Sequence, residues 1–132
     1  MIYIEKINFF KDNRGMLASI DHKKFNCFSI KRTFFINFIK SRVTRGKHAH
    51  KKCSQFIVCI TGKIKVKTID PKYNKRNFIL SSINKGIYIK PCVWVEIVSL
   101  KNNTSIVCFA DRKYEKLDYI NTLNEFKKII RR

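Results

Sequence analysis

The segment from Phe56 to Lys67 constrains the fold of this chain more than any other. Phe56–Ile60 is an apolar run, Thr61-Gly62 is a turn pair, and Lys63–Lys67 alternates lysine with isoleucine and valine. Alternation with a period of two is typical of a strand with one buried face and one face in water. Two such strands joined by two residues predict a β-hairpin, which is stable only within a larger sheet.

The rest of the chain repeats this pattern. Short β-branched or aromatic segments are separated by turn signals about every 8 to 12 residues, which is typical of all-β proteins. The expected strands are Ile2–Ile7, Met16–Ile20, Cys27–Ile30, Thr33–Phe38, Gln55–Ile60, Lys63–Ile69, Phe78–Leu80, Ile87–Ile89, Val93–Val98 and Ser105–Phe109. Without linkers or repeats, residues 1–132 are expected to form one all-β domain, a jelly-roll sandwich or a small β-barrel.

The C-terminal segment has a different period. Thr122-Leu123-Asn124-Glu125 has the composition of a helix capping box, and Leu123, Phe126, Ile129 and Ile130 lie at helical spacing. The pattern predicts a short C-terminal amphipathic helix that docks its apolar face on the sheet.

Composition excludes some classes of protein. Apolar residues make up 45% of the chain, which argues against disorder, and no apolar run approaches the roughly 18 residues that a membrane-spanning helix needs. The N-terminal residues lack the pattern of a signal peptide. The cysteines are odd in number, form no CxxC pair and are expected to be reduced thiols: Cys27, Cys53, Cys59, Cys92 and Cys108. A cytoplasmic location is therefore expected.

The charge of the chain is unusually high, at a formal net +20. Such a charge raises nucleic acid, an anionic membrane or a phosphorylated ligand as partners. The basic residues are spread along the sequence, without a block of five or six. A solvated, lysine-rich surface explains most of the charge, with one anion site beneath it.

Two of the three histidines, His48 and His50, stand two residues apart. In an extended strand such residues point to the same face, so both imidazoles are expected to face one cavity. Paired imidazoles ligate metals, or act as acid and base near neutral pH. The third histidine, His22, lies in a charged segment and is expected at the surface.

His48, His50, Gln55 and Gly62 resemble the first signature of the cupin superfamily, in which an HxH pair is followed by a glutamate and a closing glycine. Here Gln55 stands in place of the glutamate that normally ligates a metal. The histidine of the second signature is missing after Gly86-Ile87-Tyr88-Ile89-Lys90-Pro91. Two histidines and a neutral amide are a poor ligand set for a transition metal. Acid–base chemistry is therefore favoured, with no metal and no cofactor.

A longer set of motifs spans almost the whole chain. It consists of Asp12-Asn13-Arg14-Gly15, Ile30-Lys31-Arg32, Arg45-Gly46-Lys47-His48-Ala49-His50-Lys51-Lys52, Gln55, Gly62, Gly86-Ile87-Tyr88-Ile89-Lys90-Pro91 with Trp94, Tyr114-Glu115, Asp118-Tyr119-Ile120 and Glu125-Phe126. The same motifs recur in the same order in one cupin-like family. The chain thus resembles the dTDP-4-keto-6-deoxyglucose 3,4-ketoisomerases of bacterial deoxysugar synthesis, which implies a cupin-type jelly roll.

This resemblance implies a metal-free isomerase acting on a nucleotide-linked 4-keto sugar. The ketone at C4 acidifies the hydrogen on C3, so one base can remove it and leave an enediolate. Protonation at C4, while the C3 oxygen becomes the carbonyl, moves the ketone by one carbon. By the family's pattern His50 is the base at C3 and His48 positions or shuttles the proton, and the two roles can be exchanged.

The resemblance also implies residues that hold the substrate. Donors near the enediolate oxygens, arginines for the diphosphate and aromatic rings for thymine are expected. The candidates are Arg45, Gln55, Arg14, Arg32, Trp94 and Tyr119. For each aromatic residue, a place in the core is an equal alternative. Family members often carry tyrosines at Phe34-Phe35, so any role of a hydroxyl there is in doubt.

The implied partners are a dTDP-linked 4-keto-6-deoxy sugar and a second copy of the chain. A homodimer with exchanged N-terminal strands is one arrangement, and neither nucleic acid nor a membrane is expected as a partner. The product would feed synthesis of dTDP-linked 3-amino-deoxysugars, as in lipopolysaccharide O-antigens, with the galacto configuration slightly favoured. The alternatives are a basic β-barrel that binds nucleic acid, a metal-dependent cupin, and a non-catalytic sugar-binding cupin.

Overall fold

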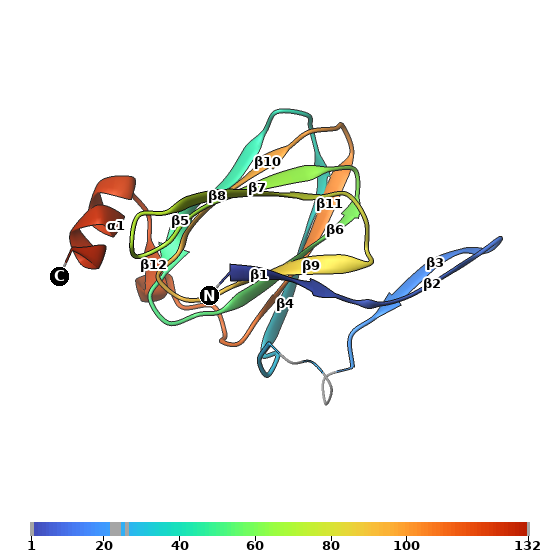
Figure 1. The fold of residues 1–132 in the computed structure, drawn as a ribbon, viewed down its shortest axis with the longest axis horizontal. Coiled ribbons are helices and arrows are strands. Elements are labelled where there is room, and N and C mark those ends of the chain that lie inside the picture. The colour runs from blue at the N-terminus through green and yellow to red at the C-terminus, as the bar shows by residue number, and fades with distance from the viewer. Residues whose placement is uncertain (1, 22–24, 26, 132) are drawn as a thin grey trace.

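Two antiparallel five-stranded sheets face each other in the computed structural model, which is described for residues 2–21, 25 and 27–131 (Figure 1). The first sheet has the order β1-β9-β6-β11-β4, with bounds Ile2–Lys6, Lys85–Ile89, Gln55–Thr61, Thr104–Ala110 and Arg32–Ile39. The second has the order β12-β5-β10-β7-β8, with bounds Tyr119–Ile120, Thr44–His50, Trp94–Ser99, Ile64–Ile69 and Lys75–Leu80. The prediction of an all-β fold is confirmed, and because the sheets do not close, the fold is a sandwich.

The core lies between the two sheets, as the alternating sequence patterns require. Ile64 and Val66 on β7 are fully buried in it, whereas Lys65 and Lys67 point to the other face. The turn between β6 and β7 depends on Gly62, whose φ is +87°, and a Cβ atom there would lie 2.3 Å from Oγ1 of Thr104. The turn therefore requires glycine. The predicted hairpin is wrong, because β6 pairs with β9 and β11 in the first sheet and β7 pairs with β8 and β10 in the second, so the turn carries the chain from one sheet to the other.

Several expected strands shift by a few residues at their ends, and one is wrong. Cys27–Ile30 has no strand structure. Instead, Phe28 packs its ring on Phe25 and Tyr88, at centroid distances of 5.3 and 6.1 Å. Its apolar residues cover the outer face of the first sheet, so burial and not strand pairing explains their hydrophobicity.

The C-terminal helix α1, Leu123–Ile130, docks on the outer face of the second sheet, as predicted. Thr122 accepts a hydrogen bond from the backbone N–H of Glu125 at 3.1 Å, which is half of the expected capping box. Phe126 is fully buried, and its ring lies 5.9 Å from that of Trp94. The helix thus covers the face of the sheet that points away from the core.

The hairpin of β2 (Asn8–Asp12) and β3 (Gly15–Ser19) forms a separate two-stranded sheet. It projects from the sandwich on the side opposite to α1, β5 and β12 (Figure 1). Most of its side chains are exposed, including those of Phe10 and Leu17.

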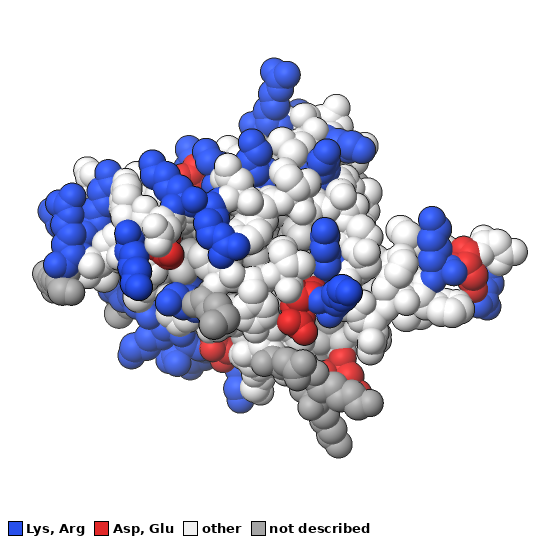
Figure 2. All heavy atoms as spheres, viewed as in Figure 1, with Lys and Arg blue, Asp and Glu red and all other residues white. Residues whose placement is uncertain are grey.

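Lysine and arginine side chains are distributed over much of the visible surface instead of forming one block (Figure 2). Among the described residues, no helix has both the length and the apolar composition needed to cross a membrane.

Candidate active site

His48 and His50 lie on β5 and face the space between the two sheets. His48 pairs with Val95, whose side chain belongs to the core between the sheets. Ala49 points the other way and packs in the cluster that contains Phe126. The two imidazole centroids lie 5.0 Å apart. The expectation that both histidines share one face is confirmed.

A β-bulge aligns Arg45 with these histidines. Val95 pairs with His48 and Ile97 pairs with Arg45, so two steps along β10 span three steps along β5. The extra residue places Arg45 on the face of His48, although their odd spacing would otherwise put them on opposite faces. Gly46 makes the bulge possible, because its φ is +84° and a Cβ atom would lie 3.0 Å from the carbonyl oxygen of Val95.

Asp118, in the turn before β12, fixes the orientation of His50. Its Oδ2 lies 3.1 Å from Nδ1 of His50, and both groups are buried. The same carboxylate accepts the backbone N–H groups of Lys52 and Cys53, at 2.8 and 3.2 Å. Because a carboxylate that already accepts two hydrogen bonds acts as an acceptor, Nδ1 of His50 carries the proton and Nε2 carries the lone pair. That Nε2 is buried and has no partner among the described residues.

His48 has the same tautomer for a similar reason. Its Nδ1 lies 3.1 Å from the carbonyl oxygen of Gly46, which can only accept. Burial lowers the pKa of His48. Burial, and then the neighbouring His48, lower the pKa of His50 to about 4 against the opposing effect of Asp118. Both imidazoles are therefore neutral at pH 7 and present Nε2 as a base.

Aromatic rings enclose the two histidines. Tyr119 pairs with His50 across β12 and β5, and its ring centroid lies 4.4 Å from that of His50 and 5.1 Å from that of His48. Tyr114 lies 5.6 Å from Tyr119 and is exposed. The structure thus brings Tyr119 to the histidines and places Tyr114 at the outer side of the same cluster.

Arg32 and Gln55 lie on the inner face of the opposing sheet. Arg32 pairs with Ala110, and Ala110 pairs with Gln55, so the three form one row across β4, β11 and β6. Ala110 is fully buried and has only a methyl group, which leaves room between its two larger neighbours. Phe34, on the same face as Arg32, packs against the core, whereas Phe35 points outward and is 70% exposed.

The structure does not bring Trp94 or Arg14 to the histidines. Trp94 lies on the outer face of its sheet, packs against Phe126 and donates its Nε1–H to Glu96 at 3.0 Å. Arg14 lies at the tip of the β2–β3 hairpin, where it forms an exposed ion pair with Asp12 at 2.6 Å. The prediction for His22 lies outside the described residues.

Asp118 and Tyr114 are the site residues that sequence reasoning did not select. Asp118 is separated from His50 by 68 residues, and only the pairing of β12 with β5 joins them. Both residues stand in the motifs Tyr114-Glu115 and Asp118-Tyr119-Ile120, which were the available signal. Nδ1 of His50, Sγ of Cys53 and a carboxylate oxygen of Asp118 lie within 4.8 Å of one another, a set that could hold a metal ion.

Fold and site together define a jelly-roll protein with an oriented His–Asp pair in its interior. Three relatives agree with this class. The TDP-4-oxo-6-deoxy-alpha-D-glucose-3,4-oxoisomerase of Aneurinibacillus thermoaerophilus is 37% identical over 126 residues, covering 94% of this chain and 90% of that protein. The structure of a sugar 3,4-ketoisomerase from Thermoanaerobacterium thermosaccharolyticum in complex with TDP has a TM-score of 0.91 and 28% identity, and covers 98% and 94% of the two chains.

The third relative is the TDP-quinovose 3,4-ketoisomerase of Campylobacter jejuni, with a TM-score of 0.87, 28% identity and coverage of 96% and 97%. The chain belongs to the FdtA family (WxcM-like, C-terminal), which it matches over residues 1–131. The resemblance inferred from the motifs is thereby confirmed, and the named relatives are sugar 3,4-ketoisomerases or oxoisomerases.

Proposed function

We propose that this protein moves the keto group of dTDP-4-keto-6-deoxyglucose from C4 to C3 by histidine acid–base catalysis through an enediolate. The observation that carries the proposal is the His50–Asp118 pair, which holds a neutral, buried Nε2 free in the site. A structure of the Thermoanaerobacterium relative, as a mutant, contains TDP-4-keto-6-deoxyglucose. A sugar with an acidic C3–H bound at Nε2 would meet a base of suitable form.

His50 removes the C3 proton in this proposal, and His48 moves the proton between the two oxygens. Asp118 stabilises the imidazolium that forms on His50, since a carboxylate at 3.1 Å favours the protonated ring. The ring centroid of His48 lies 5.0 Å from that of His50. Because Nδ1 of His48 donates to the carbonyl oxygen of Gly46, its Nε2 carries the lone pair. The two neutral imidazoles give one site both an acceptor and a shuttle.

The remaining site residues bind the substrate. Gln55 is placed to hydrogen-bond the sugar, and Tyr119 provides an aromatic wall next to the histidines. Arg32 and Arg45 supply the positive charge, Arg45 at the exposed rim of β5 and Arg32 at a half-buried position on the facing sheet. Trp94 supports α1 instead of the thymine, because it lies on the opposite face of the sheet.

Turnover of dTDP-4-keto-6-deoxyglucose, followed by NMR of the product, tests the proposal and reports the configuration at C4. His50→Asn removes the base and should lower kcat by about 10²–10⁴-fold. Retained dTDP binding and an unchanged melting temperature would show that the variant is folded. Full turnover by His50→Asn would contradict the assignment of the base.

The proposed reaction uses no metal. Asp118 is already bonded to His50 and to two backbone N–H groups, and Gln55 stands in place of a ligating carboxylate. Exhaustive treatment with EDTA should therefore leave kcat unchanged. Loss of activity on chelation, with recovery on adding a divalent metal, would favour a metal-dependent cupin.

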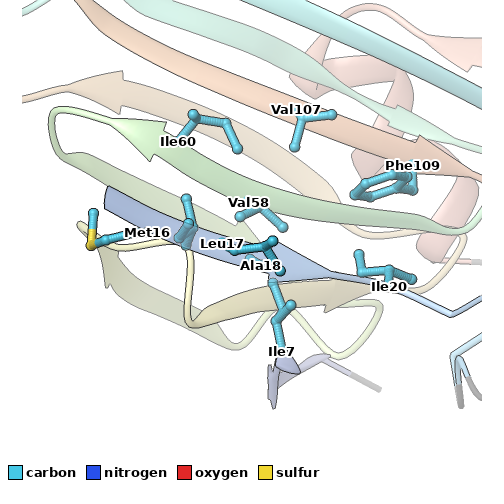
Figure 3. A pocket seen from close by; sticks show the side chains of 10 residues that line it. Ile7, Met16, Leu17, Ala18, Ile20, Val58, Ile60, Val107 and Phe109 are labelled. Atoms are coloured by element: carbon cyan, nitrogen blue, oxygen red, sulfur yellow. The ribbon is translucent and has the colours of Figure 1, made fainter. Parts of the chain in front are cut away.

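We also propose that two copies form a homodimer through the β2–β3 hairpin. Phe10 and Leu17 on the hairpin are 63% and 61% exposed. A groove of about 510 Å³ lies between the hairpin and the outer face of β6 and β11, and its labelled lining residues are apolar (Figure 3). An isolated two-stranded hairpin with apolar side chains is unstable in water, so a second copy would stabilise it. Exchange of hairpins would also bring Arg14 towards the partner.

Leu17→Asp should convert the dimer into a monomer, because it introduces a charge into the proposed interface. Light scattering after gel filtration measures the mass. Thr61→Asp, at an exposed position on the β6–β7 turn, is the matched control and should remain dimeric. A wild-type protein with the mass of one chain would contradict this assembly.

The free thiols of the described chain fit the cytoplasm, which we propose as the location.

A further inference from the structure

We infer that Arg32 is the electrophile that neutralises the enediolate oxygen, and that it does not serve as a diphosphate anchor. The inference deepens the proposed ketoisomerase function. It assigns to one arginine of the site a role in the chemical step, and it leaves binding of the nucleotide phosphates to other cations such as Arg45.

Two aromatic rings hold the guanidinium of Arg32 in place. Its Cζ lies 5.1 Å from the ring centroid of Phe34 and 5.6 Å from that of Tyr114. Both distances are within the range of about 6 Å in which a cation is attracted to a ring face. Phe34 has no hydroxyl, so its contribution here is to hold Arg32 by packing. A guanidinium fixed in this way is preorganised for one ligand position.

The Nε of Arg32 is buried and has no hydrogen-bond partner among the described residues. A buried donor without a partner is costly, and such an atom in a site points to an acceptor that arrives with the ligand. Nε2 of His50, in the same site, is another buried atom without a partner among the described residues. One site therefore contains a base without a proton and a charged donor without an acceptor, which is the pair that deprotonation next to a ketone requires.

The position of Arg32 fits the reacting atoms. Arg32 and Gln55 face the interior on either side of Ala110, whose methyl group leaves space between them. The guanidinium of Arg32 lies over the ring of Tyr114, which contacts Tyr119, and Tyr119 packs on His50, so one aromatic cluster joins Arg32 to the His–Asp pair. After burial and the neighbouring His48, the charge of Arg32 also contributes to lowering the pKa of His50. Arg45, by contrast, is exposed on β5. A charge in a partly desolvated position stabilises a developing anion more strongly than one at the exposed rim.

In the chemical step, His50 Nε2 takes the C3 proton, and the electron pair of the C3–H bond forms the C3=C4 double bond. The π pair of the C4 carbonyl moves to its oxygen, which becomes the anion beside Arg32. The proton of the C3 hydroxyl then moves to the C4 oxygen, and the C3 oxygen becomes the carbonyl. The double-bond pair takes the proton from His50 at C4. Every proton is conserved, and Arg32 remains protonated throughout.

The test separates catalysis from binding with the intact protein. Arg32→Met removes the charge while keeping an apolar stem between the rings, and it should lower kcat by about 10²–10³-fold. The Kd of dTDP, measured by titration calorimetry, should be unchanged because dTDP carries both phosphates but lacks the keto-hexose that reacts. Exchange of the C3 hydrogen with D₂O, followed by NMR, should slow by the same factor as kcat. If Arg32 had only a structural role, the rate of C3–H exchange and kcat would not fall by the same factor in Arg32→Met.

Arg45→Gln is the matched comparison and should show the opposite result, with a weaker Kd for dTDP and a smaller effect on kcat. Lys101→Gln, which removes a charge from an exposed turn, should change neither quantity. The inference would be overturned if Arg32→Met bound dTDP more weakly while keeping kcat. It would also be overturned if this variant changed neither kcat nor the Kd of dTDP. If Arg32→Met does not fold, Arg32→Gln also removes the charge while keeping a polar side chain, and its kcat and dTDP Kd decide by the same criteria. Wild-type enzyme without turnover would instead contradict the ketoisomerase function, and this inference with it.

Discussion

At the scale of single residues, Asp118 has the most partners in the site. It orients His50 and accepts two backbone N–H groups from the loop after β5. An asparagine at this position has only one acceptor oxygen, and its amide would donate to one of these three groups. The nearly isosteric change Asp118→Asn is therefore severe, because it alters the tautomer of His50.

Asp118→Asn should lower kcat by about 10²–10⁴-fold, because His50 would turn its lone pair towards the amide and its N–H towards the substrate. The variant should also be less stable by about 1–3 kcal/mol for the lost backbone hydrogen bond. Steady-state kinetics and urea unfolding measure the two effects. Asp111→Asn is the matched control, because Asp111 accepts the backbone N–H of Ser54 at 2.9 Å. It should lose stability and keep kcat.

The lowered pKa of His50 predicts an unusual pH dependence. A base must be neutral, so kcat/KM should hold as the pH falls below 6.5 and decrease only near pH 4, where His50 becomes protonated. Stability behaves differently, because the unfolded histidine binds a proton near pH 6.5 and the folded one does not. His50 should therefore lower the free energy of unfolding progressively from about pH 6.5 to pH 4. A kcat/KM profile that falls with a midpoint near 6.5 would contradict the buried environment of His50.

The sequence predicted part of the site at this scale. The period of two was sufficient to place His48 and His50 on one face, because it depends only on local strand geometry. Arg45 shares that face only because of the bulge at Gly46, which local alternation does not reveal. The contact between His50 and Asp118 depends on tertiary pairing across 68 residues. Such a contact has no signal in spacing or composition.

At the scale of elements, α1 and β10 are joined by Trp94 and Phe126. Both are buried in the cluster on the outer face of the second sheet, together with Ala49 between the two histidines. The packing of α1 therefore stabilises β5 on the face opposite to the histidines. Trp94, which the motif pattern associated with the nucleotide, packs against α1 instead.

Phe126→Ala should lower the free energy of unfolding by about 3–5 kcal/mol, because it removes a fully buried ring. Trp94→Phe should leave the Kd of dTDP unchanged. Urea unfolding and titration calorimetry measure these effects, and Lys128→Ala on the exposed side of α1 is the control. Weaker dTDP binding by Trp94→Phe would return Trp94 to the substrate site.

Elements with strict apolar alternation or helical spacing were predictable, and polar elements were not. The strand β7 and the helix α1 have the expected positions because each buries one face. The predicted pairing of β6 with β7 was wrong, because the apolar run of β6 is buried on both faces within the other sheet. The full strand β5 begins at Thr44 with a polar sequence, and it is held by pairing with β10 on one side and β12 on the other. Cys27–Ile30 was predicted as a strand because it is apolar, but its apolar residues pack on the first sheet without pairing as a strand.

At the scale of the whole molecule, the net charge of +20 requires an account. Basic side chains are spread over the visible surface (Figure 2), and within the described chain the charged groups near the histidines include Arg32. A distributed surface charge attracts any polyanion through counterion release, without specificity. It does not define a groove for nucleic acid.

Binding of a single-stranded oligonucleotide should therefore be weak and should decrease steeply as salt rises from about 50 to 200 mM. Fluorescence anisotropy measures it. Addition of dTDP should leave the residual binding unchanged, because it arises over the whole surface. Affinity that persists at physiological salt and is competed by dTDP would instead favour the basic β-barrel that binds nucleic acid.

The joining of His50 to Asp118 has a consequence for the life of the protein. The proposed base His50 is oriented only after the segment that carries Asp118 has been synthesised and β12 has docked on β5. A nascent chain in which this segment is still hidden in the ribosome would have both histidines but no oriented imidazole. By the same reasoning, a protease that cuts between β11 and β12 should inactivate the enzyme without touching a histidine.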